Sequence, residues 1–195
     1  RIMRETGCDS ISYGVESGNQ EMLDRIKKKI TLDMVREAVQ MGLDAGMVVH
    51  ASFIAGLPGE SPETLKETQA FADSLGAMYG YHYLAPFPGT TVREEVDRFD
   101  LEILTDDWNR YDANSAIVRT SKISPEEITR FVTDFENEIN EAWEKQIRGY
   151  WEKTNPPEKD LHVEGFFRTQ FVFNLLSKDL IERYGRLPGP CSPEA

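Results

Sequence analysis

The sequence predicts an α/β protein that begins with parallel strands and helical crossovers and continues as a mainly helical region. Three short apolar segments, each followed by a turn rich in glycine or proline, alternate with helical segments over the first hundred residues. The connections are short, so consecutive strands are expected to lie parallel. The carboxyl ends of such strands meet at one edge of the sheet, where α/β proteins bind ligands.

Each element of the first half has a local signal. Thr31 and Ser61 are N-cap hydroxyls followed by an acid in the first turn, and glycines end the helices that they begin. The apolar runs between the helices suit buried strands. In order, we expect a helix end stopped by Gly7, a strand at 9–15, a short helix at 19–26, a helix from Thr31 to Gly46, a strand at 47–54, a helix from Ser61 to Gly76 and a strand at 79–85.

The second half is predicted to be mainly helical. A turn at 86–89 precedes a helix that is capped by Thr90 and runs through Phe99, and residues 101–122 are irregular. Ser124 begins the longest helix, whose apolar residues recur at helical spacing. A proline break at 155–157, a helix at 161–184 and a loose tail follow. We therefore expect a first domain at 1–100, a helical extension at 101–186 and a tail at 187–195.

Composition limits the classes of function. The net charge is −12, which argues against nucleic acid or an anionic membrane as the main partner. We find neither a long apolar run nor a signal peptide, and therefore expect a cytoplasmic protein with free thiols. The two cysteines, Cys8 and Cys191, are too few and too far apart to build a zinc site or an iron–sulfur cluster from this chain alone. The chain opens with the end of a helix and no initiator methionine, so we expect a piece of a longer polypeptide.

Glu16 is the first candidate for chemistry. It follows a strand and lies between Gly14 and Gly18, which let a ligand approach the backbone closely. A carboxylate in this position can accept hydrogen bonds from two ribose hydroxyls. The alternative is that Glu16 only caps the following helix, because acids are favoured at helix starts.

Two further segments could contact a ligand. Residues 54–60 join strand to helix with two glycines and a proline, so their backbone can face a flat ring such as adenine; alternatively they form an ordinary tight loop. The run Lys27, Lys28 and Lys29 could offer an ammonium group to a carboxylate or phosphate, although such runs are usually solvated.

Polar residues also lie within the predicted strands. His50 and Ser52 alternate with apolar neighbours and share one strand face, and His82 lies on the next strand. Each histidine could contact a substrate, or could be a hydrogen-bonded core residue.

Taken in order, YGVESGN, a lysine pair before a Thr-capped helix, FIAGLPGES and PFPGT resemble the second half of a radical S-adenosylmethionine (SAM) core domain. The resemblance is to the branch whose longer members often carry an N-terminal cobalamin-binding domain. It covers residues 1–90, and more faintly residues 108–112 and 124–127. It implies a partial TIM-like barrel in which this chain supplies the fourth to sixth strands.

The resemblance also implies roles for particular residues. Glu16, with Ser17 beside it, corresponds to the acid that holds the SAM ribose, and Lys28 to a basic residue that meets the SAM carboxylate. His50, Ser52 and, by its neighbouring strand, His82 are candidate substrate contacts inside the barrel. The residues implied at the adenine ring are Ile54, Ala55 and Gly56 on one strand end and Leu84, Ala85 and Pro86 on the next.

The family's CxxxCxxC loop, which binds a 4Fe-4S cluster, is absent from this chain. The parent enzyme is expected to cleave SAM reductively to a 5′-deoxyadenosyl radical, or to methylate through cobalamin, and to act on an unknown small molecule or protein. Without the cluster, the chain alone should be inactive. We also expect it to self-associate through its exposed strand edge or its C-terminal helices.

A different class of function stays open. An α/β nucleotide-binding or protein-interaction module without catalysis would account for the same strand ends and for the aromatic C-terminal helix. The coding sequence upstream of Arg1 would discriminate between the two hypotheses.

Overall fold

The computed structural model describes the backbone of residues 1–152 and the side chains of residues 1–139. The chain divides into two compact units, residues 1–138 and residues 139–195. Of the second unit, only the continuation of one long helix is described. The helix expected at 161–184 and the tail expected at 187–195 lie outside the described residues, and the domain boundaries at residues 100 and 186 stay predictions.

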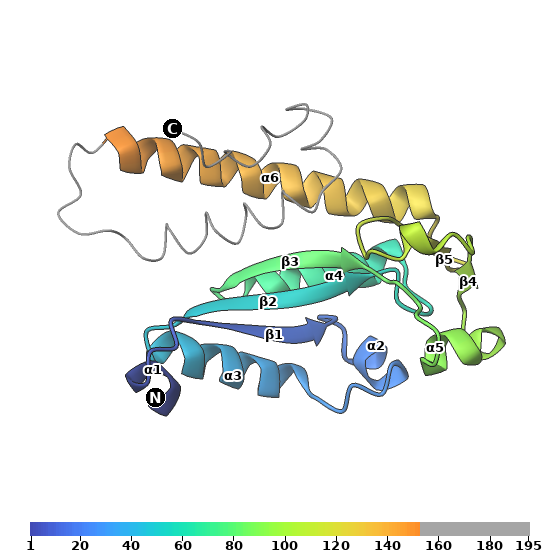
Figure 1. Ribbon diagram of the computed structural model, residues 1–195, viewed down its shortest axis with the longest axis horizontal. Coiled ribbons are helices and arrows are strands. Elements are labelled where there is room, and N and C mark those ends of the chain that lie inside the picture. Colours follow the sequence, from blue (N-terminus) through green and yellow to red (C-terminus); the bar gives the residue numbers. More distant parts are fainter. Residues whose placement is uncertain (153–195) are drawn as a thin grey trace, which may run out of the picture. The chain divides into compact units, whose positions relative to one another are not determined.

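The elements of the first half follow the predicted order, with ends within three residues of those expected (Figure 1). Helices and strands alternate, and a region of short elements then leads into the long helix. The described elements are α1 (Ile2–Glu5), β1 (Ser10–Glu16), α2 (Gln20–Arg25), α3 (Leu32–Asp44), β2 (Val48–Ala55), α4 (Pro62–Asp73), β3 (Met78–Tyr83), α5 (Thr91–Glu94), η1 (Val96–Arg98), β4 (Glu102–Ile103), η2 (Trp108–Arg110), β5 (Val118–Arg119) and α6 (Pro125–Glu152).

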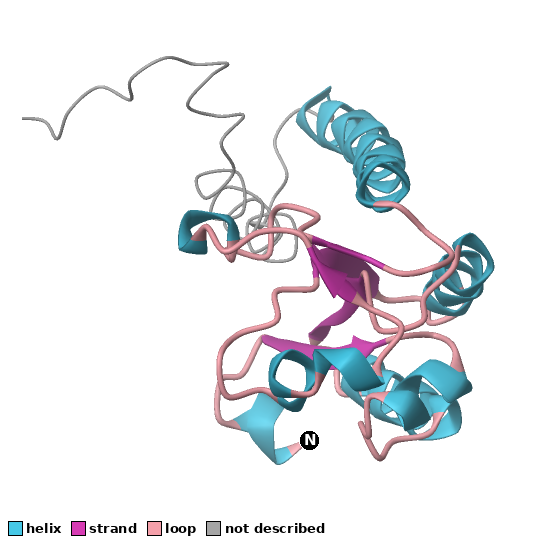
Figure 2. Cartoon of the chain, turned by 90° about the vertical axis from the view of Figure 1, so that its right-hand side faces the viewer, coloured by secondary structure: helices cyan, strands magenta, loops and turns pink. Residues whose placement is uncertain are grey.

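The three long strands form a parallel sheet in the order β1-β2-β3. The connection between β1 and β2 includes α2 and α3, and α4 connects β2 to β3. The prediction of co-directional neighbouring strands is confirmed. Figure 2 looks at the sheet from the carboxyl ends of the strands.

One face of the sheet is closed by helices. Along β2 every second residue is buried, beginning with Val49, as expected for a strand with one covered face. Gly42 of α3 packs so closely that an added Cβ would lie 2.7 Å from Cγ2 of Val49. Tyr13 of β1 donates a hydrogen bond from its hydroxyl to the Ala38 carbonyl, 3.2 Å away, in the same helix.

The start of α6 closes the same face beside β3. Ser124 caps the helix, because its hydroxyl accepts from Glu127 N at 3.2 Å and its own N–H donates to the Glu127 carboxylate at 2.9 Å. Phe135 stacks on Tyr79 with ring centroids 4.9 Å apart, and Phe131 meets Tyr81 edge-on at 5.2 Å. The first turns of the aromatic stripe therefore pack as core, as its helical spacing predicts.

Residues 86–123 differ most from expectation. The helix expected through Phe99 is two short pieces, α5 and η1, separated at Glu95, whose φ of −119° is not helical. The two-residue strands β4 and β5 pair antiparallel, and elements this short carry no periodicity from which to predict them. Tyr111 is buried in this segment, whereas Trp108 is half exposed.

No helix in the described part of the chain is both long and apolar enough to cross a membrane.

Candidate functional site

Glu16 ends β1 in an unusual backbone conformation. The pairing of β1 with β2 shifts between Gly14 and Glu16, and the φ of Glu16 is 74°, in the left-handed region that non-glycine residues rarely adopt. A Cβ added to Gly14 would lie 2.9 Å from Glu16 Oε1, so the missing side chain leaves the space that the carboxylate occupies. Strain of this kind concentrates at binding sites.

Lys28 pairs with this carboxylate. Its ammonium nitrogen lies 2.6 Å from Glu16 Oε1, and both side chains are partly buried. Lys27 and Lys29 have φ values of 56° and 59° and are exposed. Of the three lysines, Lys28 is therefore the one that the loop directs at Glu16.

The buried side chain of Glu60 binds the backbone of the turn that follows β2. Its Oε2 accepts hydrogen bonds from Gly56 N at 2.5 Å and from Leu57 N at 3.1 Å, and the residue is fully buried. Burial raises the pKa of Glu60 to about 8, although the two amide donors act in the opposite direction. Within the described residues, its Oε1 has no hydrogen-bond partner. A buried carboxyl group thus fixes the glycine turn.

Two more side chains donate hydrogen bonds to backbone carbonyls of the same turn. Arg25 of α2 donates to the Pro58 carbonyl at 2.9 Å and lies over Gly59. Thr120 donates from its hydroxyl to the Glu60 carbonyl at 2.7 Å. Sequence reasoning did not assign Arg25, Glu60 or Thr120 to the site. Only Glu60 carried a signal, as an acid just before a helix N-cap.

The end of β3 lies beside that of β2. Leu84 N donates to the Ala55 carbonyl at 2.9 Å, and a Cβ added to Gly56 would lie 3.6 Å from Leu84 Cβ. Ala85 packs, like Leu84, on a buried cluster, and the Pro86 carbonyl accepts from Arg93 at 3.4 Å. The buried cluster consists of Leu101, Tyr111, Ile117 and Val118.

The Ser17 side chain turns away from the strand ends into the interior. Its hydroxyl is buried, 3.2 Å from the Thr68 hydroxyl of α4, and accepts from Asn19 N at 3.1 Å. Gly18 N donates to the same Thr68 oxygen at 3.0 Å. Ser17 therefore fastens the loop after Glu16 to α4, and its contact with SAM stays a prediction.

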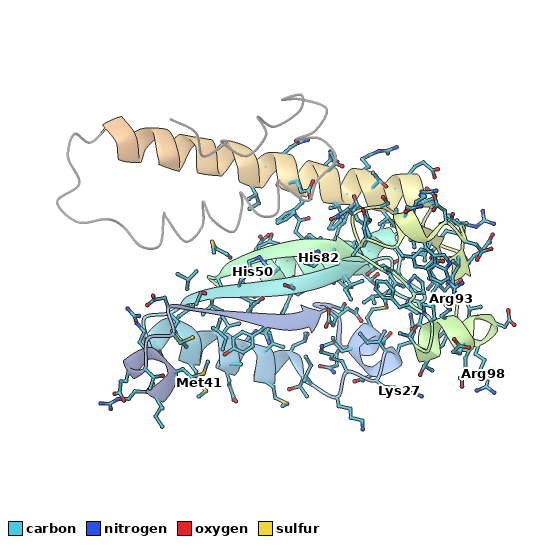
Figure 3. All side chains as sticks on the ribbon, in the orientation of Figure 1. Lys27, Met41, His50, His82, Arg93 and Arg98 are labelled. Carbon is cyan, nitrogen blue, oxygen red and sulfur yellow. The ribbon has the colours of Figure 1, made fainter. Side chains whose placement is uncertain are left out.

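The second face of the sheet is polar and less buried. Register pairs Ser12 with His50, Ser52 with Gly80, and Ile54 with His82, so these side chains share the face opposite the helices. Figure 3 shows both histidines along the sheet, and the register places them four residues apart, because His50 pairs with Met78 and His82 with Ile54. The two rings belong to neighbouring strands, as the sequence predicts.

Burial lowers the pKa of both histidines. The pKa of His50 falls further because of repulsion from His82, whereas the Glu16 carboxylate partly offsets the fall in the pKa of His82. Both shifts favour the neutral form of the imidazoles.

The structure thus brings most of the predicted residues to one edge of the sheet. Glu16, Lys28 and Ile54 lie at the carboxyl ends of β1 and β2. Ala55 and Gly56 are buried, with Val118 close above Gly56, so they can offer a ligand only their backbone. No described group of three histidine, cysteine or acidic side chains could hold a metal ion. Cys8 is half-buried and its thiol donates to the Ser10 carbonyl at 3.2 Å, which does not fit cluster ligation.

The fold and the site define a class: an α/β protein whose parallel strands present an acid, a lysine and a glycine turn at their carboxyl ends. Residues 1–72 match the model of the Radical SAM superfamily. The chain carries part of a radical SAM core domain and belongs to that superfamily, as its sequence motifs predict; the particular branch stays a prediction.

Two relatives and one solved structure show the extent of the match. An uncharacterized methyltransferase of Pyrococcus horikoshii is 30% identical over 68% of this chain and 29% of its own length. The anaerobic magnesium-protoporphyrin IX monomethyl ester cyclase of Rubrivivax gelatinosus is 34% identical over 52% of this chain and 19% of its own length. The structure of the radical SAM enzyme coproporphyrinogen III oxidase from Escherichia coli is similar in fold, with a TM-score of 0.51 and 16% identity over 71% of this chain and 28% of that one. The chain therefore spans less than a third of each of these proteins.

Proposed function

We propose that this chain supplies the SAM-binding strands of a radical SAM enzyme. The observation that carries the proposal is the Glu16–Lys28 pair, with its 2.6 Å contact, at the bulged end of β1 beside the end of β2. A carboxylate and an ammonium group together match the ribose hydroxyls and the carboxylate of SAM. The superfamily match of residues 1–72, which includes both residues, supports the assignment.

Each group has one role in this proposal. Glu16 accepts hydrogen bonds from the ribose hydroxyls, and Lys28 exchanges its contact with Glu16 for one with the SAM carboxylate. The backbone of residues 54–56 faces the adenine ring, and residues 84–86 lie at the ring's edge. Glu60 positions the Gly56 turn without touching the ligand, and Ser17 fastens the loop after Glu16.

SAM bound there supplies either a 5′-deoxyadenosyl radical or a methyl group, which is the chemistry that the superfamily implies. The thiolates for a 4Fe-4S cluster must come from outside this chain, because its two cysteines cannot provide the three that the motif needs. We therefore expect the chain alone to be inactive. Cobalamin is a candidate second cofactor of the parent enzyme, and a reducing cytoplasm suits this chemistry.

The polar face of the sheet is the proposed substrate side. His50, Ser52 and His82 lie on the face opposite the packed helices and next to the end of β1. Their donors and acceptors face the region that a barrel would enclose. In this proposal, the side chains on the polar sheet face contact the substrate, and the carboxyl ends of the strands contact SAM.

The test is titration of the 195-residue chain with SAM, followed by backbone NMR because binding without the cluster should be weak. We expect shifts at Gly14, Glu16 and Ile54, and at least tenfold weaker binding for Glu16→Gln, since a hydrogen bond to a charged group contributes about 1.5–3 kcal/mol. Glu21→Gln, an exposed acid of α2, is the matched control and should bind like the wild type. Unchanged affinity of Glu16→Gln, or shifts confined to other regions, would reject the proposal.

A further inference from the structure

Arg93 is a partly buried cation near the end of β3. It belongs to α5, seven residues after Pro86, and its side chain is 21% exposed. Figure 3 shows Arg93 on the side of the sheet toward which the carboxyl ends of the strands point. Pro86 is the last of the residues, 84–86, that we assign to the edge of the adenine ring. A charged side chain is therefore held next to the proposed SAM site.

The guanidinium group of Arg93 joins two segments of the chain. Its Nη1 donates to the Tyr111 hydroxyl at 2.7 Å and, more distantly, to the Pro86 carbonyl at 3.4 Å. Its Cζ lies 4.9 Å from the centre of the Trp108 ring and 5.4 Å from that of the Tyr111 ring. Cation–π contacts of this kind add to the hydrogen bond. One side chain thus links the turn after β3 to residues 108–111.

Tyr111 provides the fixed side of this link. Its ring belongs to the buried cluster on which residues 84–85 pack, and its hydroxyl donates to the Thr105 carbonyl at 2.7 Å. The Phe87 ring lies 6.3 Å from the Tyr111 ring. The strand end and the turn therefore rest on a buried support, to which Arg93 adds a charged hydrogen bond.

The ion pair with Asp106 does not account for the placement of Arg93. Asp106 Oδ1 lies 3.5 Å from Arg93 Nη2, and the Asp106 side chain is 94% exposed. Such an exposed pair contributes little, because solvent screens it. The shorter contact of the guanidinium group is the one to Tyr111.

The turn has hydrogen bonds of its own that do not involve Arg93. Thr90 donates to the Phe87 carbonyl from its N–H at 3.2 Å and from its hydroxyl at 2.6 Å. Gly89 N donates to the Glu94 carboxylate at 3.0 Å. Loss of Arg93 should therefore let an intact turn shift on its support without unfolding it.

We propose that Arg93 is a positioning residue for SAM, which fixes residues 84–86 through the Tyr111 hydroxyl and the Pro86 carbonyl so that the adenine ring meets a preformed edge. This inference deepens the proposed function, because it assumes that adenine lies between residues 54–56 and 84–86. Arg93 itself does not touch the ligand. Its effect is to remove the cost of ordering this edge when adenine binds.

The experiment titrates the 195-residue chain with SAM, 5′-deoxyadenosine and 5′-deoxyuridine, and follows binding by backbone NMR. The two nucleosides share the ribose and differ in the base. We expect Arg93→Met to lose about tenfold in affinity for 5′-deoxyadenosine, as for a lost hydrogen bond to a charged group, with little change for 5′-deoxyuridine. Glu16→Gln should weaken both nucleosides equally, since it removes a ribose contact. Arg98→Met, whose side chain is 74% exposed and pairs with Glu95, is the matched control and should bind all three ligands like the wild type.

Tyr111→Phe tests the same link from its other side. It keeps the buried ring and removes the hydroxyl that accepts from Arg93, so it should lower the preference for adenine in the same direction. The double variant should lose no more of this preference than Arg93→Met alone, because both changes remove one contact. Thermal unfolding of each variant shows whether the protein stays folded.

An unchanged preference for adenine in folded Arg93→Met would overturn the inference, as would equal losses in Arg93→Met and Arg98→Met. If Arg93→Met did not fold, the same ratio of affinities in Tyr111→Phe would decide. SAM shifts at Glu16 in the wild type, with adenine preference independent of Arg93, would leave the proposed function standing. A wild-type chain that bound neither SAM nor 5′-deoxyadenosine would overturn both proposals.

Discussion

At the scale of single residues, the site depends on how Glu16 is placed. The bulge in β1 gives Glu16 a left-handed backbone, and Gly14 provides the room for its carboxylate. A residue without a side chain is needed there for space, since the φ of Gly14 is not in the left-handed region. The acid's position is thus set by a residue that never touches the ligand.

We therefore predict that Gly14→Ala weakens SAM binding about tenfold without unfolding the protein. The new methyl group would lie 2.9 Å from Glu16 Oε1, and the end of a flexible side chain can move aside at little cost to stability. Titration with SAM and thermal unfolding together check this. Gly80→Ala is the matched control, because its methyl group would meet His50 Nε2 at an ordinary 3.6 Å and should leave SAM affinity unchanged. Equal affinity in the two variants would refute the steric explanation.

Glu60 makes a second prediction at this scale, concerning pH. Its pKa is about 8 in the folded state, against 4.5 for an exposed glutamate. Between these values the unfolded chain loses the proton that the folded chain keeps, so stability falls as pH rises through that window. Glu60→Gln keeps an acceptor for the Gly56 and Leu57 amides but cannot titrate. We expect the free energy of unfolding of the wild type, relative to this variant, to fall by up to about 1.4 kcal/mol per pH unit.

Urea unfolding of both proteins at pH 5, 6, 7 and 8 measures this difference. Comparison with the variant cancels the contribution of the other titrating groups, including His50, whose pKa is lowered and whose effect runs in the opposite direction. If the free energy of unfolding changed with pH in the same way for the two proteins, Glu60 would be ionised in both the folded and the unfolded state.

At the scale of elements, the first loop of the site depends on α4. The Thr68 hydroxyl accepts a hydrogen bond from Gly18 N and lies within hydrogen-bond distance of the Ser17 hydroxyl. Gly18 also packs closely on Thr68, because a Cβ added to Gly18 would lie 2.7 Å from Thr68 Cα. Residues about fifty positions apart thereby join the end of β1 to the helix that follows β2. The loop after Glu16 is consequently held by the helix that follows the Gly56 turn in the chain.

We predict that Thr68→Val lowers the free energy of unfolding by about 1–3 kcal/mol, because it leaves the buried Gly18 N–H and Ser17 hydroxyl without this partner. The substitution keeps the shape of the side chain. Thr6→Val, at an exposed helix end, is the control and should change stability by less than about 0.5 kcal/mol. Denaturant unfolding of the three proteins gives the comparison, and similar losses in both variants would contradict it.

At the scale of the whole molecule, β1 has one strand neighbour in the described sheet, and its second edge is unpaired by any described strand. Exposed edges favour pairing with another chain. We expect the 195-residue chain to self-associate with increasing concentration, as light scattering would show. Ser10→Lys places a charge on the exposed start of this edge and should reduce the association. A strictly monomeric profile of the wild type would contradict the expectation.

Much of the fold could be predicted because its signals are local. The N-caps Thr31 and Ser61 both accept the expected backbone hydrogen bonds, and the alternating pattern of β2 matches its burial. The short strands β4 and β5 could not be predicted, since pairing over two residues leaves no pattern in a sequence. The broken helix after Thr90 was missed because its N-terminal signal says little about where a helix stops.

The sequence by itself determined the order of the elements, the parallel sheet and the edge at which Glu16 and the Gly56 turn meet, because caps, stops and apolar periodicity act over a few residues. Only the tertiary structure decided that Lys28 is the lysine that pairs with Glu16, that the Ser17 hydroxyl turns into the interior, and that Glu60 is buried under its own loop. These outcomes depend on a strand bulge and on contacts with Thr68 and Thr120, which lie about fifty and sixty residues away in the chain. Packing between such distant segments sets the direction of a side chain, and no local pattern encodes it.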